Sequence, residues 1–302
     1  MSSKAKSDDT ARPETAAGAS PLPGPEQAAG QVAAVRGDGQ GQPEGRPGRA
    51  VMVHREGRGR LGGTTVLLSI IQRAFSQGRQ VKVLEGDLKS RTLARYYPSH
   101  TPEGVPIEGG VSMPRSEDFA DFKVWINGGL DAMVADGISR VLDVSGGDRA
   151  MREFLHDLDL PAFCAQFDKE LLSACMLGPD VEDFNHIRAA VDAGNLHPRH
   201  MILVLNEGVI RSGQNPAGAF DATKQHPDFL AMVKGGAVPI YVTKLPCLDL
   251  LREQRLDFYD VAAGRPGPDG TRPRPTTQFM TGKWLADFEA QHVRWGTAGR
   301  LP

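Results

Sequence analysis

The chain has 302 residues, which is enough to bury a sizeable core in one large domain or two small ones. Its formal net charge of −2 gives no general attraction to nucleic acid or to anionic membranes. The three cysteines are far apart in the sequence, which argues against a disulfide framework or a zinc site and is typical of a reducing cytoplasm. No apolar run approaches the roughly 20 residues that span a bilayer, so we expect a cytoplasmic protein without a membrane span.

Residues 1–49 differ in composition from the rest of the chain. They are rich in Pro, Gly, Ala, Ser and Gln and carry almost no large apolar side chains. Such a segment cannot bury enough surface to offset the entropy lost on ordering. The sequence therefore predicts a disordered segment over 1–49, without the apolar core of a signal peptide, and one folded domain over 50–302 with a C-terminal helical extension.

From residue 50 onward, short apolar runs alternate with helical patterns. The runs predict strands at 50–54, 80–85, 140–144, 171–177, 201–206 and 237–243. Helices are predicted at 64–77, 116–134, 149–158, 179–193, within 220–233, at 247–256 and at 279–294. The apolar residues of the last helix, over 284–295, predict a face that packs on the parent domain. Strands separated by helices predict an α/β fold with a parallel sheet and helices on both faces, in which ligands bind at the carboxyl ends of the strands.

Residues 55–71, REGRGRLGGTTVLLSII, have the form of a phosphate-binding loop that leads into a helix. In such a loop the glycines let backbone N–H groups turn onto phosphate oxygens, and the helix N-terminus adds a partial positive charge. A lysine normally precedes the Ser or Thr and reaches the β- and γ-phosphates, but Gly63 occupies that position here. Arg58 and Arg60 could each carry the missing charge, because guanidinium binds phosphate well, or each could be a solvated surface arginine.

Three polar residues follow predicted strands. Asp87 could hold a magnesium-bound water or activate the attacking water, or it could cap a helix. Asp143 precedes Gly146–Gly147, as a metal-supporting carboxylate precedes a flexible γ-phosphate sensor loop, or as a capping residue precedes a glycine turn. Asn206 could bond an adenine edge or form a turn. We expect Thr64 and Asp143 to hold Mg²⁺, and the expected nucleotide contacts are Gly57, Arg58, Gly59, Arg60, Leu61, Gly62, Gly63, Thr64, Thr65 and Asn206.

At this point residues 54–98 resemble the opening of the ParA/MinD superfamily of P-loop ATPases. That family has a Lys-Gly-Gly-x-Gly-Lys-Thr-Thr loop before a helix and a second strand that ends in an acidic pair. By position, Arg58 falls on the signature lysine of that loop. Arg60 falls on the second glycine, and Gly63 falls on the Walker lysine. The remaining matches are Gly59 and Gly62 on glycines, Thr64 and Thr65 on the threonines, and Glu85 and Asp87 on the acidic pair. The resemblance implies ATP and Mg²⁺ binding and catalytic roles for Asp87 and Arg58. It also implies nucleotide-dependent homodimers, with the signature residue reaching across.

Downstream, residues 141–177 and 201–223 are similar to TraL-type proteins of plasmid conjugal transfer. This resemblance implies a nucleotide-driven conformational or assembly switch in conjugal DNA transfer or mobilisation, with protein partners in the DNA-transfer complex. Gly63 predicts weak or absent hydrolysis. Two alternatives remain open: a pseudo-ATPase adaptor that binds partner proteins, and a ParA-like partition protein. The near-neutral charge argues against direct DNA binding, which the partition role needs.

Overall fold

The structure is a computed structural model that describes residues 49–144 and 149–302. Its centre is a six-stranded sheet in the order β2-β3-β1-β4-β5-β6, and every neighbouring pair of strands is parallel. The strands are β1 (Val51–Glu56), β2 (Val81–Glu85), β3 (Ser139–Asp143), β4 (Glu170–Leu177), β5 (Met201–Asn206) and β6 (Val238–Val242). The six predicted strands and the parallel α/β architecture are confirmed, with boundaries that shift by at most two residues.

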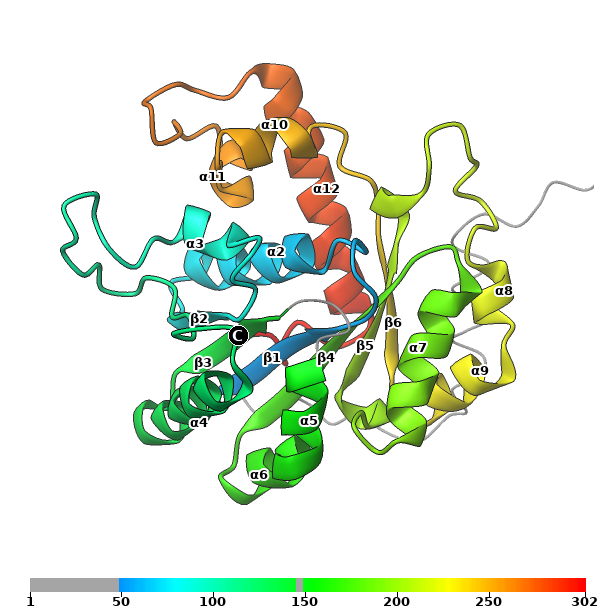
Figure 1. Cartoon of the computed structure of the whole chain (residues 1–302). Helices are drawn as coiled ribbons and strands as arrows, with labels where there is room; N and C mark the ends of the chain where they lie inside the picture. The colour runs from blue at the N-terminus through cyan, green and yellow to red at the C-terminus, as the bar shows by residue number, and fades with distance from the viewer. Residues whose placement is uncertain (1–48, 145–148) are drawn as a thin grey trace, which may run out of the picture.

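Helices cover both faces of this sheet (Figure 1). One face carries α2 (Gly63–Ser76), α3 (Thr92–Tyr96), α10 (Leu248–Glu253), α11 (Phe258–Ala262) and α12 (Pro275–Arg294). The other carries α4 (Phe119–Asp136), α5 (Arg149–Leu158), α6 (Leu160–Gln166), α7 (Val181–Asp192), α8 (Asp221–Lys224) and α9 (Pro227–Lys234). Short 3-10 turns, η1 (Pro198–His200) and η2 (Glu207–Val209), flank β5.

The alternation of side chains along β1 explains why helices pack on both faces of the sheet. Val53 of β1 belongs to the hydrophobic cluster that contains the apolar face of α2. Met52, its neighbour, points into a second cluster with α4, α5 and α6. Both side chains are fully buried, because successive side chains of a strand point to opposite faces of the sheet and both faces of this one are covered.

Several helices differ from their predicted bounds. The helix predicted over 116–134 begins at Phe119, because Ser116 lies ahead of it and accepts a hydrogen bond from the Asp118 N–H at 3.1 Å. The helix predicted within 220–233 is two short helices, and Pro227 begins the second, as its missing N–H favours. The helices α3, α6 and α11, of five to seven residues each, were not predicted as separate elements.

The predicted disordered segment lies almost wholly outside the described residues, which begin at Arg49. Arg49, the last residue of the predicted segment, forms an ion pair with Asp168 at 2.7 Å. The predicted sensor loop at Gly146–Gly147 also lies outside the described residues.

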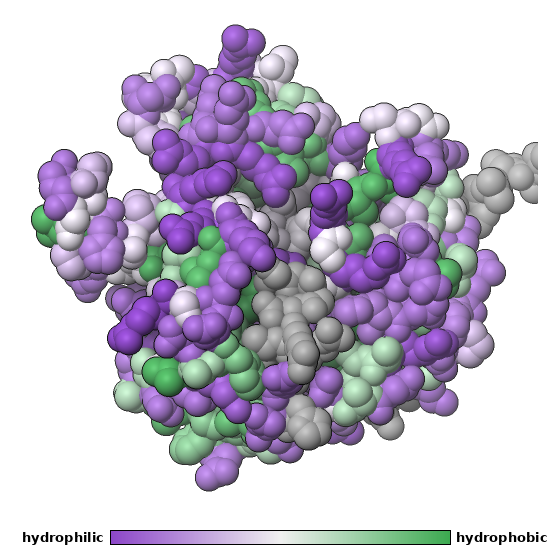
Figure 2. Space-filling model, viewed as in Figure 1, coloured by the Kyte–Doolittle hydropathy of each residue, from purple (hydrophilic) through white to green (hydrophobic). Residues whose placement is uncertain are grey.

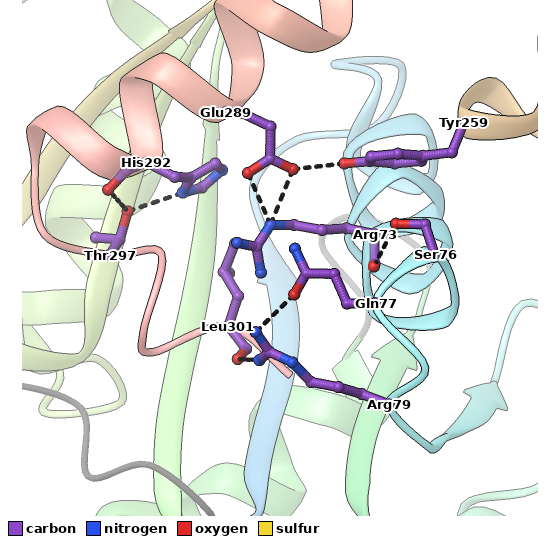
Figure 3. Close-up of polar contacts among 9 residues, drawn as sticks. All are labelled: Arg73, Ser76, Gln77, Arg79, Tyr259, Glu289, His292, Thr297 and Leu301. Atoms are coloured by element: carbon purple, nitrogen blue, oxygen red, sulfur yellow. Dashed lines mark hydrogen bonds and ion pairs between the residues drawn. The ribbon is translucent and has the colours of Figure 1, made fainter. Parts of the chain in front are cut away.

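The last helix packs on the parent domain, as predicted. Trp284, Leu285, Phe288 and His292 of α12 are buried, and the Trp284 indole N–H donates to the Thr243 carbonyl after β6 at 2.8 Å. Polar contacts join α12 to α2 and α11 at this interface (Figure 3). The C-terminal extension is therefore an integral part of the core.

The face seen in Figure 2 is mostly hydrophilic, and its hydrophobic residues form small separate groups. Within the described ranges, no helix combines the length and the apolar character that a membrane span requires.

Candidate functional site

The candidate site lies at the carboxyl end of β1, where the chain turns through residues 57–62 into α2. The crossover from β1 runs to one side of the sheet to reach β2, whereas β3 leads to β4 on the other side of β1. The adjacent strands β1 and β3 therefore form a topological switch point, the place where open α/β sheets bind ligands. The loop that the sequence singled out thus lies at the expected edge of the sheet.

Backbone geometry explains the glycines of this loop. Gly57 has φ +138°, and a Cβ on it would lie 2.9 Å from the Met176 carbonyl oxygen of β4. Gly62, the residue before α2, has φ +78°. Both positions are in the region that favours glycine. Arg60 also has a positive φ, +68°, which costs an L-residue about 1–2 kcal/mol. The backbone conformation at residue 60 therefore favours glycine.

The loop exposes a row of backbone donors. The N–H groups of residues 58–64 donate no hydrogen bond to any residue that the structure describes. The N–H of Gly57, just before them, contacts the carboxylate of Glu56 at 3.3 Å. Gly59 has no atom within 4 Å of where its Cβ would be, so the loop is open on that side. Unpaired N–H groups beside the N-terminus of a 14-residue helix fit a phosphate group.

Asn206 holds the loop from the neighbouring strand. Its side-chain amide donates to the Leu61 carbonyl oxygen at 2.7 Å, and its Oδ1 accepts from the Gly208 N–H at 2.9 Å. A Cβ on Gly62 would lie 2.5 Å from the Asn206 Nδ2 atom. These contacts give Asn206 a structural role and favour the turn interpretation over adenine recognition, because one amide hydrogen and one oxygen lone pair are already used.

Arg58 extends from the loop toward the start of α7. Its Nη1 atom lies 3.2 Å from the Asp183 Oδ1 and 3.8 Å from the Asp180 Oδ2, and its side chain is 50% exposed. Asp183 is buried, and burial raises its pKa although Arg58 acts in the opposite direction. The contacts of Arg58 in this structure are carboxylates of its own chain.

Glu85 and Asp87, the predicted acidic pair, have different surroundings. Glu85 is fully buried and accepts hydrogen bonds from the Leu93 and Ala94 N–H groups of α3 at 2.9 and 2.8 Å. Burial raises the pKa of Glu85. Asp87 accepts from the Lys89 and Ser90 N–H groups at 3.2 and 2.9 Å, as a capping residue of the following turn does. Asp87 thus caps a turn and not a helix, because α3 begins at Thr92 and its N-cap residue is Arg91.

The charged residue beside Gly63 was not among the predicted site residues. It is Arg55 of β1, whose Nε donates to the Asp143 Oδ1 at the end of β3 in a short charged hydrogen bond. A Cβ on Gly63 would lie 2.4 Å from the Arg55 Cδ atom and 3.2 Å from its Nε. The predicted strand ended at residue 54, so the prediction did not include residue 55 in the strand or place it beside β3.

The predicted magnesium residues lie at the same edge of the sheet. Thr64 is the second residue of α2 and is partly exposed, and its hydroxyl has no hydrogen-bond partner among the described residues. Asp143 is buried, between Arg55 on one side and Glu85, its register partner in β2, on the other. No group of three or more His, Cys, Asp and Glu side chains in the described ranges could hold a metal. A magnesium ion would therefore need phosphate oxygens as further ligands, as is usual for Mg²⁺.

A second polar pair lies beneath the loop. The Glu56 carboxylate, at the end of β1, lies 3.0 Å from His186 Nε2 of α7. Burial raises the pKa of Glu56, but the hydrogen bond from His186 and the nearby histidine charges outweigh it and hold that pKa below its ordinary value. The pair anchors the end of β1, directly before the loop, to α7.

The sequence matches no protein-family model, and no curated protein matches it in sequence. Among solved structures, the chain is similar to the MinD cell division protein of Aquifex aeolicus, with a TM-score of 0.43 and 12% identity over 78% of this chain and 96% of that one. It is also similar to a putative plasmid partition protein of Borrelia burgdorferi bound to AMPPNP, with a TM-score of 0.45 and 10% identity over 80% and 99% of the two chains. For FtsY of Mycoplasma mycoides the TM-score is 0.40 and the identity 13%, over 68% and 64%. Because the identities and TM-scores are this low, a conclusion about function must come from the residues of this chain.

Proposed function

We propose that this protein binds ATP with Mg²⁺ in the loop of residues 57–64 and hydrolyses it slowly or not at all. The observation that carries the proposal is the row of backbone N–H groups over residues 58–64 without a partner among the described residues, at the N-terminus of α2 and at the switch point of the sheet. Thr64 and Asp143 would support the metal, and the loop glycines would hold the phosphates. A ParA/MinD-like nucleotide switch is the class of protein that this arrangement fits.

Slow hydrolysis follows from the residues around the loop. Gly63 supplies no side chain to the β- and γ-phosphates. Asp87 accepts two backbone N–H groups in its own turn, which leaves it less free to activate water. Arg58 contacts Asp183 and would have to leave this carboxylate to reach a partner subunit in a nucleotide-dependent homodimer. Nucleotide binding would then act as a conformational or assembly switch.

The biological setting that we propose is plasmid conjugal transfer or mobilisation, in the cytoplasm, with protein partners of the DNA-transfer complex. The resemblance of residues 141–177 and 201–223 to TraL-type proteins supports the setting. Three free, buried cysteines are consistent with a reducing compartment. A net charge of −2 disfavours the alternative of a partition protein carried on DNA.

A pseudo-ATPase adaptor is the second candidate function. The position of Gly63 favours it, together with the use of Arg58 and Asn206 in contacts within the chain. An adaptor of this kind would keep the loop as a folded turn and would bind partner proteins without nucleotide.

A titration with fluorescent ATP and ADP, with and without Mg²⁺, separates the two functions, and phosphate release measures hydrolysis. The proposal predicts saturable binding that Mg²⁺ strengthens for ATP, with little phosphate released. Absence of saturable binding in both conditions would contradict nucleotide binding and leave the adaptor as the better account. Rapid phosphate release would contradict the slow-hydrolysis part alone.

A further inference from the structure

We propose that Arg55 provides the positive charge for the phosphates that Gly63 lacks. This inference depends on the proposed function, because it concerns the same nucleotide. It assigns a binding role to a residue that lies outside the phosphate-loop motif, two positions before its first glycine. It also explains how the loop can lack its usual lysine and still bind an anion.

The first support is the space beside Gly63. The Arg55 Cδ atom lies 2.4 Å from the position that a Cβ of residue 63 would occupy, and its Nε lies 3.2 Å from it. The side chain of Arg55 thus lies where the side chain of residue 63 would begin. An arginine from β1 and a lysine from the first turn of α2 would compete for the same volume, so glycine at position 63 and arginine at position 55 form a matched pair.

The second support is the state of the guanidinium group. The Arg55 side chain is only 10% exposed, and its one hydrogen bond within the described residues runs from Nε to Asp143. Its two terminal NH₂ groups donate to no residue within the described ranges. Neither terminal nitrogen belongs to the fully buried, unpaired polar atoms of the described residues, so an anion can reach them. Asp143 therefore holds the arginine in place while the terminal donors remain available for an anion at the adjacent loop.

The other two arginines of the loop fit this role less well. Arg58 is bonded to Asp183 and half exposed. Arg60 is exposed and has no hydrogen bond or ion pair with any described residue, but no contact ties it to the first turn of α2. Of the three, only Arg55 has a side chain that is mostly buried and lies beside Gly63. Arginine also suits the role chemically, because its planar fork binds phosphate with two parallel hydrogen bonds and remains charged when buried.

The test compares nucleotide affinities of the full-length wild type and two variants. Arg55→Gln keeps a hydrogen-bond donor for Asp143 but removes the charge. Arg140→Gln is the control, because Arg140 is also a buried arginine of the central sheet, bonded to Asp136 at 2.7 Å, but lies near the amino end of β3. Thermal melting of all three proteins reports whether each variant folds.

We expect Arg55→Gln to bind ATP and ADP about tenfold to hundredfold more weakly, with a smaller loss for AMP. A lysine-type charge contacts the β- and γ-phosphates, whereas a merely structural loss would weaken all three ligands alike. Arg140→Gln should bind all three as the wild type does, even if its melting temperature falls. Equal ATP affinity for wild type and folded Arg55→Gln would overturn the role of Arg55 and leave the proposed function intact. If wild type binds none of the three nucleotides, the proposed function itself fails.

A charge exchange tests the same inference if Arg55→Gln does not fold. The double variant Arg55→Ala/Gly63→Lys removes the arginine side chain that blocks residue 63 and supplies a lysine there. The proposal predicts that it binds ATP within a few-fold of wild type, whereas Gly63→Lys alone gains no affinity, because its Cβ collides with Arg55. Tighter binding by Gly63→Lys alone would show that Arg55 does not already fill this role.

Discussion

Arg73 of α2 donates through Nε to both carboxylate oxygens of Glu289 in α12, at 3.0 Å each (Figure 3). The Tyr259 hydroxyl of α11 donates to the same carboxylate at 2.7 Å. The Arg73 side chain is only 5% exposed, and its Nη1 atom is buried without a partner in the described part of the chain. This charged contact therefore fixes α11 and α12 on the face of the sheet that carries α2.

Removing the carboxylate should destabilise the protein. Glu289→Ala leaves the buried Arg73 charge without its partner, and we expect the free energy of unfolding to fall by about 2–4 kcal/mol, somewhat below the ~3–5 kcal/mol of a fully buried pair because Glu289 is 30% exposed. Urea unfolding measures the change. Lys123→Ala, which removes an exposed pair with Asp157, is the control and should cost less than about 1 kcal/mol. Equal losses of unfolding free energy for both variants would contradict a stabilising role of the contact between Arg73 and Glu289.

His292 should make the domain acid-sensitive. Burial, with the Arg73 charge, lowers its pKa from 6.5 to about 3. Between these values the unfolded chain binds a proton that the folded protein does not, so stability is complete above pH 6.5 and falls as the pH decreases toward 3. The wild type should lose about 2 kcal/mol from this group between pH 6.5 and pH 5. His292→Gln should not show this loss.

Measuring both proteins at both pH values isolates the histidine. Asp257, whose pKa burial raises to about 6, acts in the opposite direction and is present in both proteins. An identical pH dependence for wild type and His292→Gln would show that His292 is protonated in the folded state.

Asn206→Asp tests whether the Asn206 side chain holds the loop of residues 57–62 in place. Aspartate keeps the oxygen that accepts from the Gly208 N–H but replaces the donor to Leu61 by an acceptor that faces a carbonyl oxygen. We expect a loss of about 1–3 kcal/mol in stability and faster hydrogen exchange over residues 57–63. Unchanged exchange in the loop would mean that the contact does not hold it.

Arg60→Gly should stabilise the protein, unlike most substitutions. Glycine relieves the positive φ of residue 60, which costs about 1–2 kcal/mol for an L-residue, although it adds flexibility to the unfolded chain. We expect a net gain of about 0.5–1 kcal/mol in thermal or chemical unfolding. Arg58→Gly, at a position outside the positive-φ residues of the loop, should give no gain. A loss for Arg60→Gly would reveal a favourable role of the arginine side chain.

Asp143→Ala should separate the metal from the nucleotide. It removes the carboxylate proposed to support Mg²⁺ and also frees Arg55. We expect ATP binding to lose its dependence on Mg²⁺, as measured by titration with fluorescent ATP in the presence and absence of the metal. A collapse of thermal stability with both affinities lost would identify Asp143 as a structural residue.

The sequence predicts the sheet well because its strands are nearly pure apolar runs with helical patterns between them. β5, for example, has the predicted bounds at both ends. Short helices escape such analysis because they contain too few residues to show a period. α3 has five residues and begins after Arg91, which has a positive φ. The acceptor that caps α3 is the buried carboxylate of Glu85. Glu85 lies seven residues before Thr92, in β2, so the contact is apparent only in the folded structure.

The part of the candidate site that lies in one contiguous segment was predictable from the sequence. The loop from Gly57 to Thr64 is contiguous, and its position before α2 follows from the pattern. The environment of Asp143 was not predictable, because the order of strands in the sheet decides that β1 is its neighbour. Asn206 was expected at the site edge for the same general reason as Asp143, but its bond to Leu61 depends on the exact path of the loop.

Helix α2 connects the loop of residues 57–62 with the contact between Arg73 and Glu289. It begins at the loop and has 14 residues, so it is about 21 Å long at 1.5 Å per residue. Its last turns carry Arg73 and its contact with Glu289. A tilt of α2 at the loop would therefore displace α12, whose Phe279 and Val293 side chains are 73% and 69% exposed. A fluorophore attached at either position is placed to report on events in the loop without touching it.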